Sequence, residues 1–294
     1  MTVQGTGDKG IDYAACSYGR SANLFRGPQQ RLREDYVAFI GGTETFGRFI
    51  ETPYPALVEA ALGLPAVNLG CQRAGIDAFV SSHSLVDICA KARVTVIEVL
   101  GAPNMSNRHY TVDTRRNECF LRASKALKTI FPEVDFRRFE TTADLLIGLA
   151  RVCPQRLHAV RQELQTAWVA RMRTLMDQIG GPVVLLWAAD HAPFSQAAGG
   201  TICRSPVFID RAMLNAVAPR ADAMVEVVIT EDEIEAGRSD MVFDAFEAPA
   251  AQELLGPVAH RRIAGELTAV LVRLLDIDAG PQPLEEPLQM LEAG

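Results

Sequence analysis

The chain has 294 residues, of which 48% are hydrophobic and 22% are charged, a balance that excludes a disordered or fibrous protein. Its formal net charge of -7 and its pI of about 5.3 exclude an overall basic field that would hold a nucleic-acid backbone. The N-terminal residues are polar, and no stretch reaches the roughly 20 apolar residues of a membrane span. We therefore expect a cytoplasmic protein with no nucleic-acid or membrane partner.

Apolar runs that end in glycine or other turn residues predict five buried strands, at residues 36–40, 65–69, 94–100, 182–188 and 224–229. Segments with helical spacing of apolar residues alternate with them, at residues 54–62, 75–91, 208–217 and 260–275. This alternation is typical of βαβ units with right-handed crossovers. We therefore predict an α/β domain with a parallel sheet over residues 36–277.

Three further segments flank or interrupt this domain. Residues 117–179 show helical periodicity, which predicts a helical insertion or a long crossover. Residues 1–35 are polar with isolated apolar side chains, and we interpret them as an arm that packs on the domain or on a partner subunit. This interpretation is compatible with a chain that forms a homo-oligomer. Residues 278–294 are rich in Pro and Glu, which predicts a loose tail.

The six cysteines are scattered singly through the chain, without a Cys-x-x-Cys pair or a Cys/His cluster of zinc spacing. This distribution predicts reduced thiols and no structural metal. The glycines after the first predicted strand do not have Gly-x-Gly-x-x-Gly spacing, and the sequence contains no Gly-Lys-Ser/Thr phosphate loop. We therefore predict no bound cofactor.

Polar side chains follow three of the predicted strands at their carboxyl ends. The segments are Gly42-Thr43-Glu44, residues 68–71 (NLGC) and residues 101–104 (GAPN). In open α/β sheets, ligands bind outside the carboxyl ends of the strands, so we look for function around Thr43. The alternative is a plain turn into the next helix, in which Thr43 is the helix cap.

The order and spacing of these segments resemble the sequence blocks of the SGNH (GDSL-like) hydrolase superfamily, in which successive strands end in Gly-Asp-Ser, Asn-x-Gly and Gly-x-Asn. The longest match is IGGTETFGRFIETPYPALVEAALGLPAVNLGCQRAG, at residues 40–75. This resemblance implies a three-layer αβα sandwich with a central, mainly parallel five-stranded sheet, SGNH- or flavodoxin-like. The chain also resembles a bacterial domain-of-unknown-function family, through its FRGP, GGTETFG and NRxYxVxxRRN stretches.

By the SGNH resemblance, the nucleophile position falls on Thr43, and the oxyanion donors fall on the Gly70 amide and Asn104. Threonine stands in place of the family's serine, and its β-methyl group restricts the rotation of the hydroxyl. The family's Asp-x-x-His segment before the last helix is missing. The base is therefore either His260, at the start of the closing helix, or His191, which follows the fourth strand. The alternative roles are a helix-capping residue for His260 and a turn residue for His191.

The resemblance implies a hydrolase or acyltransferase, such as an esterase, that acts on an acyl ester of a small molecule or carbohydrate. Its chemistry needs a hydroxyl that a histidine activates and donors aimed at the developing negative charge. The alternative is a non-catalytic SGNH-like protein that binds an anionic or sugar ligand, or that serves as an assembly component. Because the family's serine is absent, the sequence leaves both functions open.

A basic loop after Asn104 adds candidate ligand-binding residues. They are Asn107, Arg108, Arg115 and Arg116. Arginines beside a parallel-sheet crevice suit bidentate binding of a carboxylate, sulfate or phosphate, and the alternative is a set of surface ion pairs. Glu44 and Cys71 complete the predicted ligand-binding set, because each stands next to an expected catalytic position. The alternative for Cys71 is a small buried residue.

Overall fold

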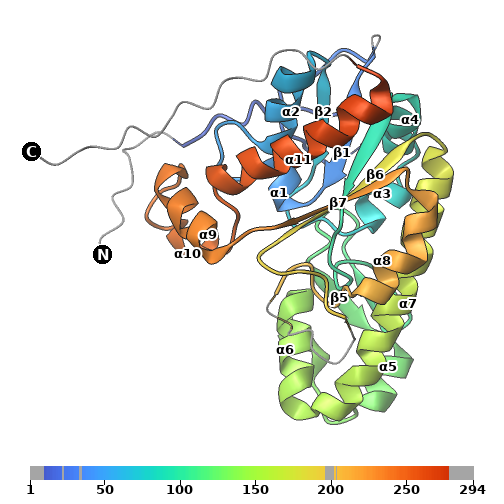
Figure 1. The fold of residues 1–294 in the computed structure, drawn as a ribbon. Coiled ribbons are helices and arrows are strands. Elements are labelled where there is room, and N and C mark those ends of the chain that lie inside the picture. The colour runs from blue at the N-terminus through green and yellow to red at the C-terminus, as the bar shows by residue number, and fades with distance from the viewer. Residues whose placement is uncertain (1–9, 22, 33–34, 196–201, 203, 278–294) are drawn as a thin grey trace, which may run out of the picture.

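The computed structural model describes residues 10–21, 23–32, 35–195, 202 and 204–277. Its centre is a sheet of five parallel strands in the order β2-β1-β3-β6-β7 (Figure 1). The strands are β1 (Val37–Gly41), β2 (Ala66–Gly70), β3 (Val94–Glu98), β6 (Val183–Ala189) and β7 (Ala223–Val228). This flavodoxin-like order confirms the predicted α/β fold with a five-stranded parallel sheet. The predicted tail, residues 278–294, lies outside the described residues.

Helices cover both faces of the sheet, so successive residues of each strand enter two separate cores. The helices of one face are α3 (Asp77–Val80), α4 (His83–Lys91), α7 (Pro154–Ile179) and α8 (Arg211–Val217). Those of the other face are α2 (Tyr54–Leu62) and α11 (Pro257–Leu275). In β1, Ala38 and Ile40 belong to the first core, while Val37 and Phe39 belong to the second. The predicted three-layer sandwich is thus confirmed (Figure 1).

The segment between β3 and α7 contains strands as well as the expected helices. Its elements are β4 (Tyr110–Val112), β5 (Phe120–Ala123), α5 (Lys125–Ile130), the 3-10 helix η1 (Phe136–Arg138) and α6 (Thr142–Val152). The strands β4 and β5 form a separate two-stranded antiparallel sheet. The expected helical insertion, residues 117–179, therefore includes one strand, β5.

Several short elements were not predicted from the sequence. They are α1 (Thr43–Phe46), η3 (Ala218–Arg220), α9 (Glu231–Gly237), η4 (Arg238–Asp240) and α10 (Ala248–Ala251). The single helix predicted at residues 75–91 is divided into α3 and α4, because the backbone of Ser82 is extended. No helix among the described residues has the length and apolar character required to cross a membrane.

Part of the N-terminal arm packs on the domain. The side chains of Tyr18 and Phe25 are buried, and Phe25 pairs with Cys16 in an antiparallel bridge. The Arg26 guanidinium donates hydrogen bonds to the carbonyl oxygens of Gly47, at 2.7 Å, and Glu51, at 2.8 Å. The arm therefore contacts the segment that follows α1, next to the carboxyl end of β1.

Candidate functional site

The main chain of Arg73 connects Thr43 and Asn104 at the carboxyl edge of the sheet. Gly41 pairs with Gly70 in the parallel register, which sets the segments after β1 and β2 side by side. The Arg73 amide donates a 3.0 Å hydrogen bond to Thr43 Oγ1, and Asn104 Nδ2 donates a 3.0 Å hydrogen bond to the Arg73 carbonyl. Two of the predicted site residues are thus brought to one place.

The Glu98 carboxylate holds the turn that carries Thr43. Its Oε2 atom accepts hydrogen bonds from the Gly42 amide at 2.8 Å, from the Thr45 amide at 3.0 Å and from the Thr45 hydroxyl. A Cβ atom at Gly41 would lie 2.3 Å from the same oxygen, so only glycine fits there. The carboxyl end of β3 therefore fixes the backbone at the carboxyl end of β1.

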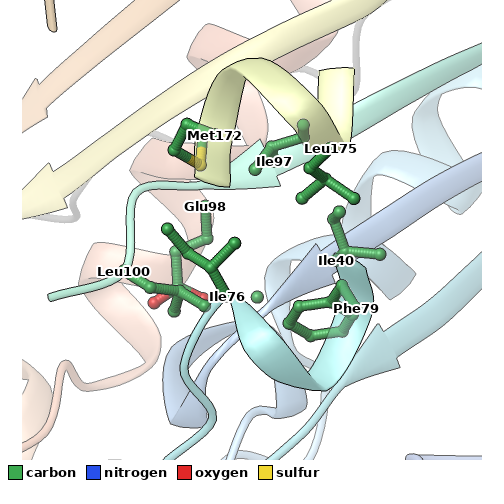
Figure 2. A pocket seen from close by; sticks show the side chains of 9 residues that line it. Ile40, Ile76, Phe79, Ile97, Glu98, Leu100, Met172 and Leu175 are labelled. Carbon is green, nitrogen blue, oxygen red and sulfur yellow. The ribbon is translucent and has the colours of Figure 1, made fainter. Parts of the chain in front are cut away.

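The pKa of Glu98 is raised to about 7, mainly because the carboxyl group is buried. The hydrogen bond from the Thr45 hydroxyl opposes this rise, and the nearby Glu44 carboxylate contributes to it. The side chain of Glu98 borders a narrow hollow that has no room for a water molecule (Figure 2). Its other lining residues are Ile40, Gly41, Ile76, Phe79, Ile97, Leu100, Met172 and Leu175. This hollow is a gap in the apolar core and leaves no space for a substrate.

His260 is enclosed next to Glu44, which belongs to the same turn. It is fully buried, its Nδ1 atom accepts a 3.1 Å hydrogen bond from the Tyr54 amide, and its ring stacks on the Tyr54 ring. Its Nε2 atom lies 3.6 Å from Glu44 Oε2, while Glu44 Oε1 accepts a hydrogen bond from the Leu255 amide. The Nε2 atom of His260, like that of His191, has no hydrogen-bond partner among the described residues, and the whole ring is enclosed by protein. This enclosure does not place His260 against the Thr43 hydroxyl, so its predicted role as the base stays a prediction.

His191 forms a pair with Asp190 just after the carboxyl end of β6. Its Nδ1 atom lies 2.7 Å from Asp190 Oδ1, and Arg204 donates a 2.9 Å hydrogen bond to Asp190 Oδ2. The buried His191 ring packs against Phe194 and Trp187, with centroid distances of 4.7 and 5.5 Å. Its Nε2 atom has no hydrogen-bond partner among the described residues. The pair thus presents one unused ring nitrogen.

Hydrogen bonds and charge keep Asp190 ionised. Burial alone would raise the pKa of Asp190, but hydrogen bonds from His191 and Arg204 outweigh this effect and lower the pKa below its ordinary value. An ionised Asp190 fixes the orientation of the His191 ring through the contact at Nδ1. The pair therefore has the arrangement of a general base that a carboxylate orients.

The surroundings of Gly70 and Cys71 indicate that both residues have structural rather than catalytic roles. The Gly70 amide donates a 2.8 Å hydrogen bond to Asn68 Oδ1, and a Cβ atom at Gly70 would lie 2.3 Å from the Phe46 amide nitrogen. The amide is thus unavailable as an oxyanion donor in this arrangement, contrary to expectation. Burial raises the pKa of the Cys71 thiol to about 11, so at neutral pH it is a protonated, weakly reactive group.

The basic loop lies at the surface. Asn107 Oδ1 accepts hydrogen bonds from two main-chain amides of its own turn, so this side chain stabilises the loop. Asp113 Oδ1 accepts hydrogen bonds from the amides of Arg115 and Arg116 in the same way. The side chains of Arg108, Arg115 and Arg116 are exposed, and none of them forms an ion pair with another described residue. They form a local basic surface rather than part of the buried site.

The sequence analysis did not predict two carboxylates of the site, although the sequence contains a feature that points to each of them. Glu98 is the one charged residue of the apolar run VTVIEVL, and a carboxylate in a strand buried on both faces requires internal partners. Asp190 directly precedes His191, a spacing that is also ordinary in turns. Among the described residues, no group of three or more His, Cys, Asp and Glu side chains is placed to bind a metal ion.

The family model described as domain of unknown function DUF6473 matches residues 1–275. The chain belongs to this family. This membership confirms the predicted relation to a domain-of-unknown-function family. No curated protein sequence matches the chain.

Two solved structures are similar to this chain at low identity. One is described as a GDSL-like lipase from Bacteroides ovatus, with a TM-score of 0.42, 11% identity, and coverage of 86% of this chain and 57% of that chain. The other is described as a gut microbial diltiazem-metabolizing enzyme, with a TM-score of 0.37, 9% identity, and coverage of 80% and 46%. This chain thus spans about half the length of these proteins. Similarities at this level carry no information about its activity.

Proposed function

We propose that the protein is an SGNH-like hydrolase or acyltransferase that acts on an acyl ester of a small molecule or carbohydrate. In this proposal Thr43 is the nucleophile and His191, oriented by Asp190, is its general base. The observation that supports it is the Nε2 atom of His191, which lies at the carboxyl edge of a parallel sheet and has no hydrogen-bond partner among the described residues. A histidine whose other nitrogen is held by a carboxylate is the form that activates a hydroxyl.

The proposed reaction has two steps. His191 Nε2 takes the Thr43 hydroxyl proton as the oxygen attacks the ester carbonyl, and the alcohol then leaves with that proton. The resulting acyl-threonine is cleaved by water in a hydrolase, or by a second alcohol in an acyltransferase. Thr43 Oγ1 already accepts a hydrogen bond from Arg73, and its own proton is donated to no described residue, so the hydroxyl can donate to a base.

The reaction requires the loop that carries His191 to move toward Thr43, because hydrogen bonds to Glu98 hold the turn after β1. Because β3 lies between β1 and β6, and neighbouring strands are about 4.8 Å apart, the two strand ends are roughly 10 Å apart. Substrate binding must bring Thr43 and His191 within hydrogen-bond reach. Asn104 Nδ2, which now donates to the Arg73 carbonyl, would exchange that bond for one to the oxyanion.

Hydrolysis of p-nitrophenyl acetate and butyrate tests the proposal. We expect Thr43→Ala and His191→Gln each to lower kcat/KM at least about 100-fold, because each removes a group that takes part in proton transfer. Thr43→Ser should retain activity, since it keeps the hydroxyl. His158→Gln, which replaces an exposed histidine on α7, is the matched control and should not change the rate.

Equal rates for the wild type, Thr43→Ala and His191→Gln would contradict the proposal. The alternative function, a non-catalytic protein that binds an anionic or sugar ligand, would then be favoured. The observation that supports this alternative is the exposed basic surface of Arg108, Arg115 and Arg116, whose guanidinium groups are not engaged in ion pairs with described residues.

A further inference from the structure

Arg161 is a largely buried arginine whose guanidinium forms no ion pair within the part of the chain that the structure describes. It lies on α7 and is 8% exposed. Its Nε atom is shielded from solvent and has no hydrogen-bond partner among the described residues, and its guanidinium forms no ion pair with any of them. The contact that the structure gives this group is with the face of the Phe208 ring, 5.3 Å from the guanidinium carbon to the ring centroid.

Buried charges in folded proteins are normally paired and hydrogen-bonded, because removing an ion from water is costly. Burial lowers the pKa of Arg161, and the carboxylate of Asp210 opposes this effect. Arginine nevertheless remains charged near neutral pH, since its ordinary pKa is above 12. The position therefore carries a positive charge that calls for an anionic partner.

Asp210 is not that partner. Its Oδ1 atom accepts a 2.9 Å hydrogen bond from the Met213 amide at the start of α8, and its Oδ2 atom accepts a 3.1 Å hydrogen bond from Gln165 Nε2. Its carboxylate lies beyond ion-pair distance of Arg161. Gln165 also donates to the Phe208 carbonyl at 3.0 Å, which holds the Phe208 segment in place over Arg161.

Two other arginines of the same helix have partners for their guanidinium groups, unlike Arg161. Arg171 forms an ion pair with Asp77 at 3.0 Å, and Arg173 donates a 2.8 Å hydrogen bond to the Ala216 carbonyl. Both are half-buried, so burial on α7 is compatible with complete pairing. The unpaired state is thus particular to the position of Arg161, between α7 and the segment that leads to α8.

We propose that Arg161 is the anchor of a binding site for a monoanionic carboxylate ligand. The planar guanidinium matches a carboxylate through two parallel hydrogen bonds. The nearby Asp210 charge favours a single negative charge over the two charges of a phosphate group. This inference goes beyond the proposed function and does not depend on it, because binding at Arg161 requires neither Thr43 nor His191.

Thermal unfolding with acetate as the probe tests this site. We expect roughly 100 mM acetate to raise the Tm of the wild type above its value in chloride at equal ionic strength and pH, because a ligand that binds the native state stabilises it. Arg161→Met should abolish the acetate-dependent shift. Arg171→Gln, which removes a paired arginine from the same helix, is the matched control and should retain the shift.

A second measurement does not depend on the ligand. In chloride alone, Arg161→Met should have a Tm equal to or above that of the wild type, because an apolar side chain replaces an unpaired buried charge. A marked fall in Tm would show that the guanidinium is already paired within the protein and would overturn the proposal.

Three results with acetate would also overturn the proposal. The first is a wild type whose Tm is the same in acetate and chloride. The second is an Arg161→Met variant that responds to acetate as the wild type does. The third is loss of the shift in the double variant Arg115→Ala/Arg116→Ala with Arg161 intact, which would assign the anion to the exposed basic loop.

Discussion

The single side chain of Glu98 determines the backbone position of the turn that carries Thr43. Its Oε2 atom accepts three hydrogen bonds from the turn after β1, and Glu98 is the one charged residue of its strand. The Tyr54 hydroxyl lies 2.5 Å from Thr45 Oγ1, and Thr45 in turn donates to Glu98. This chain of hydrogen bonds satisfies polar groups that would otherwise be buried without partners.

The raised pKa of Glu98 predicts a pH-dependent stability. The pKa rises from 4.5 to about 7 on folding, so the folded state binds the proton more tightly than the unfolded state. The contribution of Glu98 to stability is then fully present below pH 4.5 and is lost as the pH rises to about 7, by an amount on the order of 3 kcal/mol. Urea unfolding at pH 5 and pH 8 measures this difference.

Glu98→Gln should remove this contribution to the pH dependence, because glutamine keeps an acceptor oxygen but does not titrate. At pH 8 the variant should therefore be more stable than the wild type. Glu51→Gln, at an exposed position near the same turn, is the control and should keep the wild-type dependence. A Glu98→Gln variant with an unchanged difference between pH 5 and pH 8 would show that another group titrates.

The N-terminal arm is an element whose packing the sequence predicted only as a choice between two surfaces. The sequence indicated a segment that packs either on the domain or on a partner, and the structure places Phe25 and Arg26 on the domain itself. Arg26 donates to two carbonyl oxygens of the segment after α1, and its guanidinium lies 5.1 Å from the centroid of the Tyr13 ring. The arm thus stabilises the turn that carries Thr43.

Arg26→Ala should lower the free energy of unfolding by about 2 to 4 kcal/mol, because it removes two charge-assisted hydrogen bonds. Denaturant unfolding measures this loss. Arg31→Ala is the matched control, since Arg31 is an exposed residue of the same arm and forms no ion pair with a described residue. If both variants lose the same stability, the contacts of Arg26 contribute nothing specific.

Long elements were predictable from the sequence, and short ones were not. The strands of the central sheet are buried on both faces, so each one is an apolar run that periodicity reveals. The strands β4 and β5 have three and four residues, too few for a clear pattern. The break between α3 and α4 was missed because apolar spacing continues across Ser82, where only the backbone changes.

At the scale of the whole molecule, the parallel sheet explains which parts of the site could be predicted. Parallel strands bring their carboxyl ends to one edge, and this rule alone brings Thr43 and Asn104 together. The surroundings of His260 depend instead on its contact with Tyr54, which lies 206 positions away in the chain. Such a contact depends on the packing of α2 against α11 and leaves no local pattern in the sequence.

The central claim is that His191 activates the Thr43 hydroxyl, and covalent labelling tests it most directly. A fluorophosphonate transfers its phosphonyl group to an activated hydroxyl and releases fluoride, so the site of attack can be identified by mass spectrometry. We expect one adduct, on Thr43, that forms at least about 100-fold more slowly in His191→Gln. Absence of an adduct on Thr43, or equal labelling rates in the two proteins, would contradict the claim.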